Sequence, residues 1–293
     1  MIRRRAVIGL SLLSALLCCA FAAQGALAVE KESENTTAFT CAPGSGAGFS
    51  DAHCDKAVGS GASFVHTAIA NNTQTKIGGN NEKVTNSTKD HETAVLGGKI
   101  GLTATEITCT KYTIDEKNSY IENSEPKAKD HKVKGTVRAE FSECTVHKPT
   151  FCRIDEPVVV EATFVGVDGL TGPKTEENAM GLRFKGEKEA GASKDVFASV
   201  TYRDNGGACA LKDKTFPITG TAIGTSGPGT EENQATNKHT GATTVFKGKS
   251  AEPHNVVMQK LHIGTEANKA EFSTIATTKM AESGNPISLT TTT

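Results

Sequence analysis

Two runs of alternating apolar and polar residues constrain the fold of this chain more than any other feature. In 132–141 one face carries apolar side chains and the other charged or hydroxylated ones, a period of two that is typical of a half-buried strand. The run 157–167 is apolar on nearly both faces, which favours a central position in a sheet. The peptide from Cys144 to Cys152 joins the two runs, so we predict a hairpin connection that a disulfide could close.

The rest of the chain is also rich in strand signals. Six further segments have strand character: 63–69, 94–113 with a slip that resembles a bulge, 195–202, 214–224, 255–263 and 270–278. The stretches 70–92 and 115–130 read as loops. Since no long segment of period 3.6 follows the leader, we predict an all-β fold, either a β-sandwich or a partly closed barrel.

The first 28 residues have the pattern of a signal peptide. Three arginines precede an apolar run over 6–22, and Ala26-Leu27-Ala28 fits the small-x-small cleavage rule, so we predict cleavage after Ala28. The alternatives are a membrane anchor, twin-arginine export and a lipoprotein acylated at Cys18 or Cys19. We therefore expect a secreted, extracellular protein without a stable membrane span.

The expected domain organisation follows from these patterns. Residues 29–38 read as a disordered leader, 39–285 as a single β-rich domain and 286–293 as a flexible tail. Two β subdomains with a boundary near 168–195 are the alternative. A short repeat, Gly-Pro-x-Thr-Glu-Glu-Asn at 172–178 and again at 227–233, indicates either a duplicated unit or a coincidence of composition.

Six cysteines remain after the predicted cleavage, and an even number in an exported chain most simply means three disulfides. Fifteen pairings are open to six cysteines, and spacing only ranks them. Short spacing favours two pairs and elimination leaves the third, so the expected bridges are Cys41–Cys54, Cys144–Cys152 and Cys109–Cys209.

Charge and aromatic content exclude some partners. Loss of the leader removes three of the 32 basic side chains and none of the 33 acidic ones, which leaves a net charge near −4 with the signs interspersed. Neither nucleic acid nor an anionic membrane surface is an expected partner. The absence of tryptophan weakens a sugar-stacking surface but leaves a cell-surface or polysaccharide ligand open.

Two local patterns could carry metal or thiol chemistry. Cys144, His147 and Cys152 have zinc-like spacing but supply only three ligands, so a disulfide with a solvent-facing His147 is the preferred interpretation. His53 beside Cys54 resembles a thiol-protease pairing, which a bridge to Cys41 would prevent.

Other catalytic patterns are weaker still. The acid pairs Glu176-Glu177 and Glu231-Glu232 could serve a glycosidase or bind calcium, but they lie in polar loops. Ser124-x-x-Lys127 matches a penicillin-interacting motif only formally, and no Gly-x-Ser-x-Gly elbow occurs. We assign no catalytic, cofactor-binding or metal residue and expect no cofactor.

Several cysteine-anchored motifs resemble a known group of proteins. They are Phe39-Thr40-Cys41, Phe49-Ser50-Asp51-Ala52-His53-Cys54, Ile107-Thr108-Cys109, Phe141-Ser142-Glu143-Cys144 with Cys152, and Cys209-Ala-Leu. Together they resemble an uncharacterised family of exported, β-rich proteins found in multiple copies in soil actinobacteria. The resemblance covers most of the chain after the leader and implies secretion and a β-rich fold, with no assigned activity.

The sequence thus leads to one preferred function and two alternatives. We expect a secreted or cell-surface β-sandwich protein with a binding or structural role, not an enzyme. The first alternative is an extracellular hydrolase of polysaccharide or peptidoglycan that uses paired carboxylates. The second is a calcium-dependent adhesion module.

Overall fold

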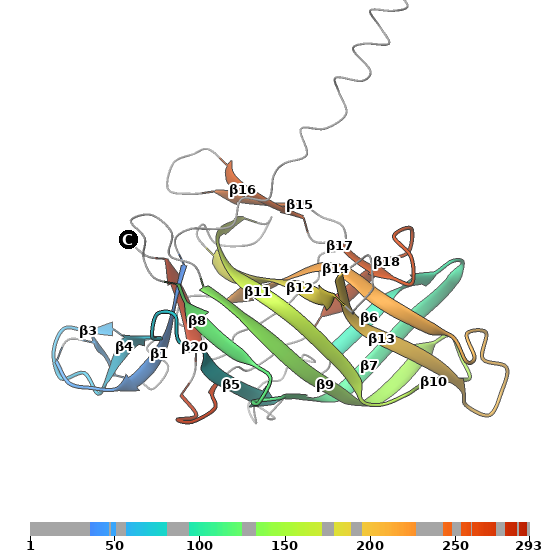
Figure 1. Cartoon of the computed structure of the whole chain (residues 1–293), viewed down its shortest axis with the longest axis horizontal. Coiled ribbons are helices and arrows are strands. Elements are labelled where there is room, and N and C mark those ends of the chain that lie inside the picture. Colours follow the sequence, from blue (N-terminus) through green and yellow to red (C-terminus); the bar gives the residue numbers. More distant parts are fainter. Residues whose placement is uncertain are drawn as a thin grey trace, which may run out of the picture. The chain divides into compact units, whose positions relative to one another are not determined.

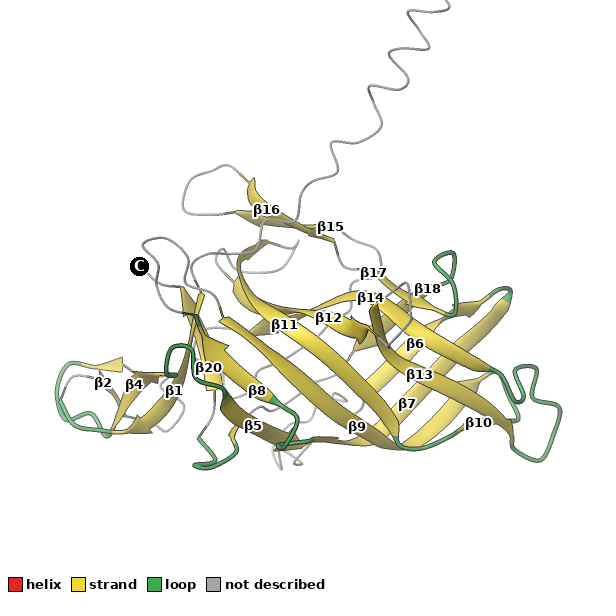
Figure 2. Ribbon diagram, viewed as in Figure 1, coloured by secondary structure: helices red, strands yellow, loops and turns green. Residues whose placement is uncertain are grey.

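The fold is known from a computed structural model. It describes residues 36–46, 48–50, 57–80, 94–124, 133–171, 179–188, 195–226, 243–247, 253–258, 260–273, 279–285 and 287–291. Over these ranges the chain forms twenty strands and no helix (Figure 2), which confirms the all-β prediction. Accordingly, the described ranges include no apolar helix of membrane-spanning length.

The largest sheet closes on itself into a barrel of antiparallel strands. Hydrogen-bonded pairs lead from β6 through β7, β9, β11, β12, β14, β17 and β18 back to β6. β13 pairs with β12 and β14, and β10 pairs with β13, so ten strands build the wall. Their bounds are β6 (Ala94–Ile100), β7 (Thr103–Ile114), β9 (Val133–Lys148), β10 (Cys152–Ile154), β11 (Val158–Thr171), β12 (Ala179–Lys188), β13 (Asp195–Asp204), β14 (Thr215–Ser226), β17 (Lys260–Ile263) and β18 (Lys269–Ser273). Of the two predicted architectures, the barrel is the one observed.

The alternating runs that predicted the fold lie side by side in this wall. β9 and β11 pair in continuous register from Phe141 opposite Val158 to Lys134 opposite Val165, and β12 follows on the other side of β11 (Figure 1). Because the pairing is antiparallel and the period is two, apolar residues of both strands gather on the inner face. Most of them join one large buried cluster, in which Tyr202 is fully buried and shares a hydrogen bond with Thr105, whereas Val133 and Phe164 belong to a second cluster.

The strands before and after the proposed boundary near 168–195 belong to the same barrel. β11 and β12 pair with each other across the segment that we considered as a subdomain boundary. The hairpin of β15 (Thr243–Lys247) and β16 (Pro253–Met258) extends the sheet from the end of β11.

The 94–113 segment is a hairpin, not one bulged strand: Gly101, with φ of 61°, and the exposed Leu102 form the turn between β6 and β7.

A second, five-stranded sheet joins the two ends of the described chain. Its strand order is β20 (Ile287–Thr291), β1 (Thr36–Pro43), β4 (Phe64–Ala68), β2 (Gly48–Phe49) and β3 (Ala57–Val58). The expected disordered leader was therefore wrong for residues 36–38, and the expected flexible tail was wrong for 287–291. The physical reason is that Ala38, Ile287 and Leu289 are buried in a second apolar cluster, which only pairing between distant strands can create.

One buried asparagine links this second sheet to the barrel side of the chain. Asn123 ends β8 (Tyr120–Asn123), which lies in the 115–130 stretch that we expected to be a solvated loop. Its Nδ2 donates to the carbonyls of Ala38 and Ile69 at 2.9 and 2.7 Å, and its Oδ1 accepts from the amide of Ala38 at 2.8 Å. The side chain thus pairs with β1 as a neighbouring strand would. β8 itself lies between β9 and β5 (Thr75–Asn80), and β19 (Lys279–Met280) pairs with β5.

Disulfides form, but two of the predicted pairings were wrong. The bridges are Cys109–Cys144 and Cys152–Cys209, in place of Cys144–Cys152 and Cys109–Cys209. The reason is that β9 continues through Cys144 to Lys148 instead of ending in a hairpin loop, which places Cys144 directly opposite Cys109 on β7. Cys41 is also disulfide-bonded, whereas Cys54 lies outside the described residues, so the Cys41–Cys54 pair stays a prediction.

Candidate functional site

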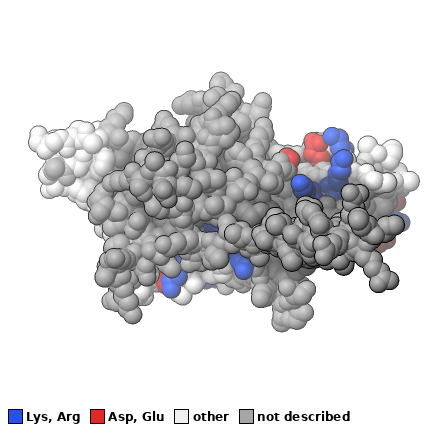
Figure 3. Space-filling model, turned by 90° about the horizontal axis from the view of Figure 1, so that it is seen from above, with Lys and Arg blue, Asp and Glu red and all other residues white. Residues whose placement is uncertain are grey.

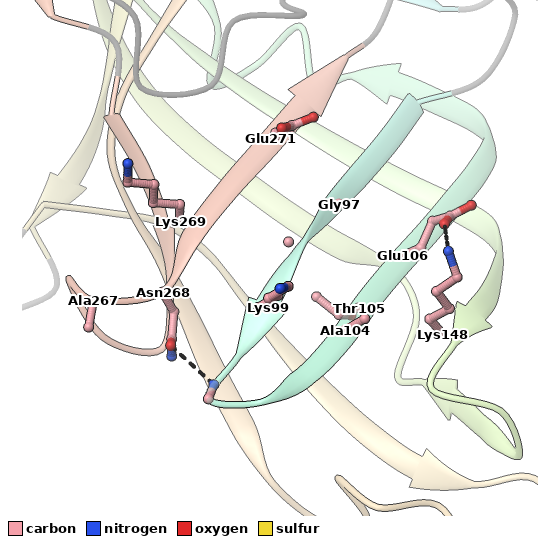
Figure 4. A pocket seen from close by; sticks show the side chains of 12 residues that line it. Gly97, Lys99, Ala104, Thr105, Glu106, Lys148, Ala267, Asn268, Lys269 and Glu271 are labelled. Carbon is pink, nitrogen blue, oxygen red and sulfur yellow. Dashed lines mark hydrogen bonds and ion pairs between the residues drawn. The ribbon is translucent and has the colours of Figure 1, made fainter.

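A groove of about 580 Å³ lies on the outer face of β6, β7 and β18 (Figure 4). The turn before β18 and the last residue of β9 complete it. The lining includes five charged side chains. It consists of Gly97, Gly98, Lys99, Gly101, Ala104, Thr105, Glu106, Lys148, Ala267, Asn268, Lys269 and Glu271.

The groove exists because a glycine occupies the middle of a charged row. In the sheet register Gly97 lies opposite Glu106 on β7 and opposite Glu271 on β18, as Figure 4 shows on three adjacent strands. A Cβ at Gly97 would have no heavy atom within 4 Å, so the missing side chain leaves open space. A glycine inside a strand often marks a site where another molecule approaches the backbone closely.

The next glycine has a different role. A Cβ at Gly98 would lie 2.7 Å from the carbonyl oxygen of Lys269, which is closer than real side chains come to a backbone atom. Gly98 therefore permits the close approach of β6 and β18, whereas Gly97 provides the hollow above them.

An ion pair holds one side of the groove. Glu106 on β7 lies opposite Lys148 at the end of β9, and the carboxylate accepts a hydrogen bond from Lys148 Nζ at 3.0 Å. This hydrogen bond and the charge of Lys148 lower the pKa of Glu106. Glu106 is thus an ionised acceptor whose charge is already balanced.

The turn at the open end of the groove is fixed by an asparagine. Asn268 Oδ1 accepts a hydrogen bond from the amide of Gly101 at 3.1 Å, and Asn268 Nδ2 donates to the carbonyl of Ile263, also at 3.1 Å. One side chain therefore holds the turn before β18 against the turn between β6 and β7. This contact sets the position of Lys269 relative to β6.

The groove brings two carboxylates to opposite sides of Gly97. Glu106 and Glu271 are two strands apart, so their Cα atoms are separated by about 9.5 Å at the usual strand spacing. In glycosidases one of two such acids has a raised pKa and protonates the leaving oxygen. The pKa of Glu106 is shifted in the opposite direction. The geometry suits acceptance of hydrogen bonds from a ligand better than proton donation.

The outer surface carries interspersed charges. Figure 3 shows basic and acidic side chains close together in the right half of the face seen. A second example is Arg138, which contacts Asp115, Glu161 and Glu140 at 2.9, 3.0 and 3.2 Å. Hydrogen bonds from Asn118 and Arg138 lower the pKa of Asp115 to about 2. Arg138 thus holds three carboxylates, and this cluster links β9 to β11 and to the turn after β7.

The two cysteines of the zinc-like pattern have other partners. Cys144 and Cys152 are bonded to different cysteines, and His147 is exposed as expected but lies on β9 and not in a loop. Within the described ranges, no three His, Cys, Asp or Glu side chains are grouped as metal ligands.

Several other candidates lie outside the described residues. They are His53, Lys127, the acid pairs at 176–177 and 231–232, both Gly-Pro repeats and the leader 1–28.

None of the groove residues was a candidate in the sequence. Gly97 and Gly98 interrupt an otherwise regular strand, and that interruption was the one available signal. The charged residues come from four strands and meet only through the sheet register, which composition and local spacing do not reveal.

Comparisons with protein-family models, with curated proteins and with solved structures find no match for this chain. The fold and the groove geometry therefore carry the functional argument.

Proposed function

We propose that this chain is an exported binding protein whose outer-face groove above Gly97 holds a polyhydroxylated ligand such as an extracellular polysaccharide. Export is supported by the signal-peptide pattern of 1–28 and by the two disulfides, which form in oxidising compartments. The barrel is the scaffold, and the groove is the part that meets the ligand.

The single observation that carries the proposal is the open space over Gly97 between two carboxylates. Sugar hydroxyls donate to carboxylates and accept from ammonium groups, and the lining offers both kinds of partner on a rigid sheet. Three antiparallel strands form the floor of the groove, so the hydrogen-bonding groups of the protein are already positioned before the ligand binds. This limits the conformational entropy that binding costs.

Binding is a better description than hydrolysis for this site. A glycosidase needs a protonated acid at working pH, whereas Lys148 lowers the pKa of Glu106 and keeps it ionised. Glu271 is exposed to solvent, where it can accept hydrogen bonds from a ligand.

The proposal is tested by filling the groove without disturbing the sheet. Gly97→Val adds a β-branched side chain that strands accept and that meets no atom at its Cβ. Gly59→Val is the matched control, because Gly59 is exposed and also has no neighbour within 4 Å. The oxidised proteins are incubated with insoluble cellulose, chitin, cross-linked pectate and peptidoglycan, and the bound fraction is measured.

The wild type and Gly59→Val should be retained on at least one of these polymers, and Gly97→Val should lose at least about tenfold in affinity, or 1.4 kcal/mol. Equal retention of all three proteins would overturn the role of the groove. Release of new reducing ends by the wild type would show hydrolysis and overturn the binding assignment.

A further inference from the structure

Two lysines that form no ion pair with the described residues start from neighbouring strand positions in the groove, and their side chains point in different directions (Figure 4). Gly98 on β6 pairs with Ala270 on β18, so the next position of this antiparallel register places Lys99 beside Lys269. Directly opposite residues of adjacent strands have Cβ atoms about 4.5–5.5 Å apart. Neither lysine side chain bonds to any residue in the described part of the chain.

This pair leaves the groove with unbalanced positive charge. Lys148 is bonded to Glu106, which leaves Glu271 as the remaining carboxylate of the lining for Lys99 and Lys269. Like charges at directly opposite positions of a sheet are unfavourable, and an anion bound at either ammonium group reduces the repulsion. The whole chain has a net charge of −1, so the groove is locally positive on an acidic protein.

The framework around the lysines holds them in place. Asn268 precedes Lys269 and bonds to the amide of Gly101 and to the carbonyl of Ile263, so the turn that presents Lys269 is fixed against β6. The backbone of Lys269 also lies close to Gly98, where a larger residue would push the strands apart. The two ammonium groups therefore start from neighbouring, fixed backbone positions.

We infer that the groove selects polysaccharides that carry acidic groups, with Lys99 and Lys269 each donating to an anionic group of the polymer. Each ammonium group donates up to three hydrogen bonds, and bonds between charged partners are stronger than neutral ones. Glu271 and Glu106, in the adjacent row across Gly97, accept from the hydroxyls of the neighbouring sugar. This inference rests on the proposed function and adds the chemical class of the ligand.

The test compares a double variant of the groove with a control of equal charge. Lys99→Gln/Lys269→Gln removes the two ammonium groups, and Lys111→Gln/Lys214→Gln makes the same change at two exposed lysines outside the lining. The affinities of both variants and of the wild type are measured by calorimetry for polygalacturonate, phosphorylated dextran, neutral dextran and polyglutamate.

We expect the wild type to bind an acidic glycan more tightly than neutral dextran. The groove variant should lose at least about tenfold in affinity for the acidic glycan, while the control keeps it. The polygalacturonate and phosphorylated dextran arms identify the anion as carboxylate or phosphate.

Three outcomes would overturn the inference. Equal binding of neutral and acidic dextran, lost in Gly97→Val but kept in the lysine variant, would leave the proposed function standing and remove the acidic ligand class. Equal binding of polyglutamate and polygalacturonate would show recognition of charge without sugar. Failure of every glycan to bind would overturn the proposed function as well.

Discussion

Cys109 on β7 and Cys144 on β9 lie directly opposite each other, with Cα atoms 4.0 Å apart, and their disulfide joins two strands that already share a hydrogen-bonded ladder. The second disulfide, Cys152–Cys209, ties β10 to the loop after β13. Both bridges therefore strengthen one region of the barrel wall and do not connect separate domains.

The first prediction concerns these bridges. The double variant Cys109→Ala/Cys144→Ala removes the disulfide that joins residues 35 positions apart. For a loop of that length the chain-entropy model gives a loss of about 4 kcal/mol in the free energy of unfolding. Urea unfolding of the variant and the wild type under oxidising conditions measures this loss. Mass spectrometry of the digested wild type provides the check, since a peptide that links Cys144 to Cys152 would contradict the structure.

The second prediction concerns the buried amide of Asn123. Asn123→Ala leaves the amide and carbonyl of Ala38 and the carbonyl of Ile69 without their partner, at a cost of about 1–3 kcal/mol for each group left unsatisfied. Asn205→Ala, at an exposed position, should change the free energy of unfolding by less than about 0.5 kcal/mol. Similar values for both variants would show that Asn123 does not hold β1.

The third prediction concerns the C-terminal strand. Leu289 is 3% exposed and packs in the second apolar cluster, so Leu289→Ala should cost about 2–3 kcal/mol. Leu102→Ala makes the same chemical change at a fully exposed turn and should cost less than about 0.5 kcal/mol. Thermal unfolding of the two variants distinguishes an ordered β20 from a loose tail, for which both effects would be small.

The fourth prediction concerns acid. The pKa of Asp115 is lowered from 3.8 to about 2 in the folded chain, first by the hydrogen bond from Asn118 and then by Arg138. Its contribution to stability is thus present above pH 4 and is lost as the pH falls from about 4 to 2. Asp115→Asn should be less stable than the wild type at pH 6, and this difference should shrink below pH 4.

A carboxyl titration followed by NMR gives the direct check of that shift. The midpoint for Asp115 should lie near 2 in the wild type and should rise in Asn118→Ala. A midpoint near 3.8 in the wild type would contradict the contacts around Asp115.

Local patterns predicted the strands well and their partners poorly. The alternation in 132–141, 157–167, 195–202 and 214–224 coincides with β9, β11, β13 and β14, because a half-buried strand imposes a period of two on its own residues. The all-β fold followed from the same local information. The expectation that Cys109, Cys144, Cys152 and Cys209 form disulfides followed from their even number in a chain with an export signal. The pairings did not, since the partner of Cys144 depends on how far β9 continues and on its register with β7.

The missed features share one physical origin. β1 pairs with β20 across nearly the whole chain, and the groove needs β6, β7, β9 and β18 in register around Gly97. The burial of Ile287 and the open space at Gly97 are properties of such assembled strands. A single sequence shows each segment separately, so neither property was visible before the strands were paired.

Binding of the ligand over Gly97 is measured by NMR titration of the isotope-labelled, oxidised protein with short galacturonate oligomers. The largest amide shifts should be those of Gly97, Lys99 and Glu271, and they should vanish in Gly97→Val. Shifts confined to other parts of the barrel, or identical shifts in Gly97→Val, would show that the ligand does not lie over Gly97.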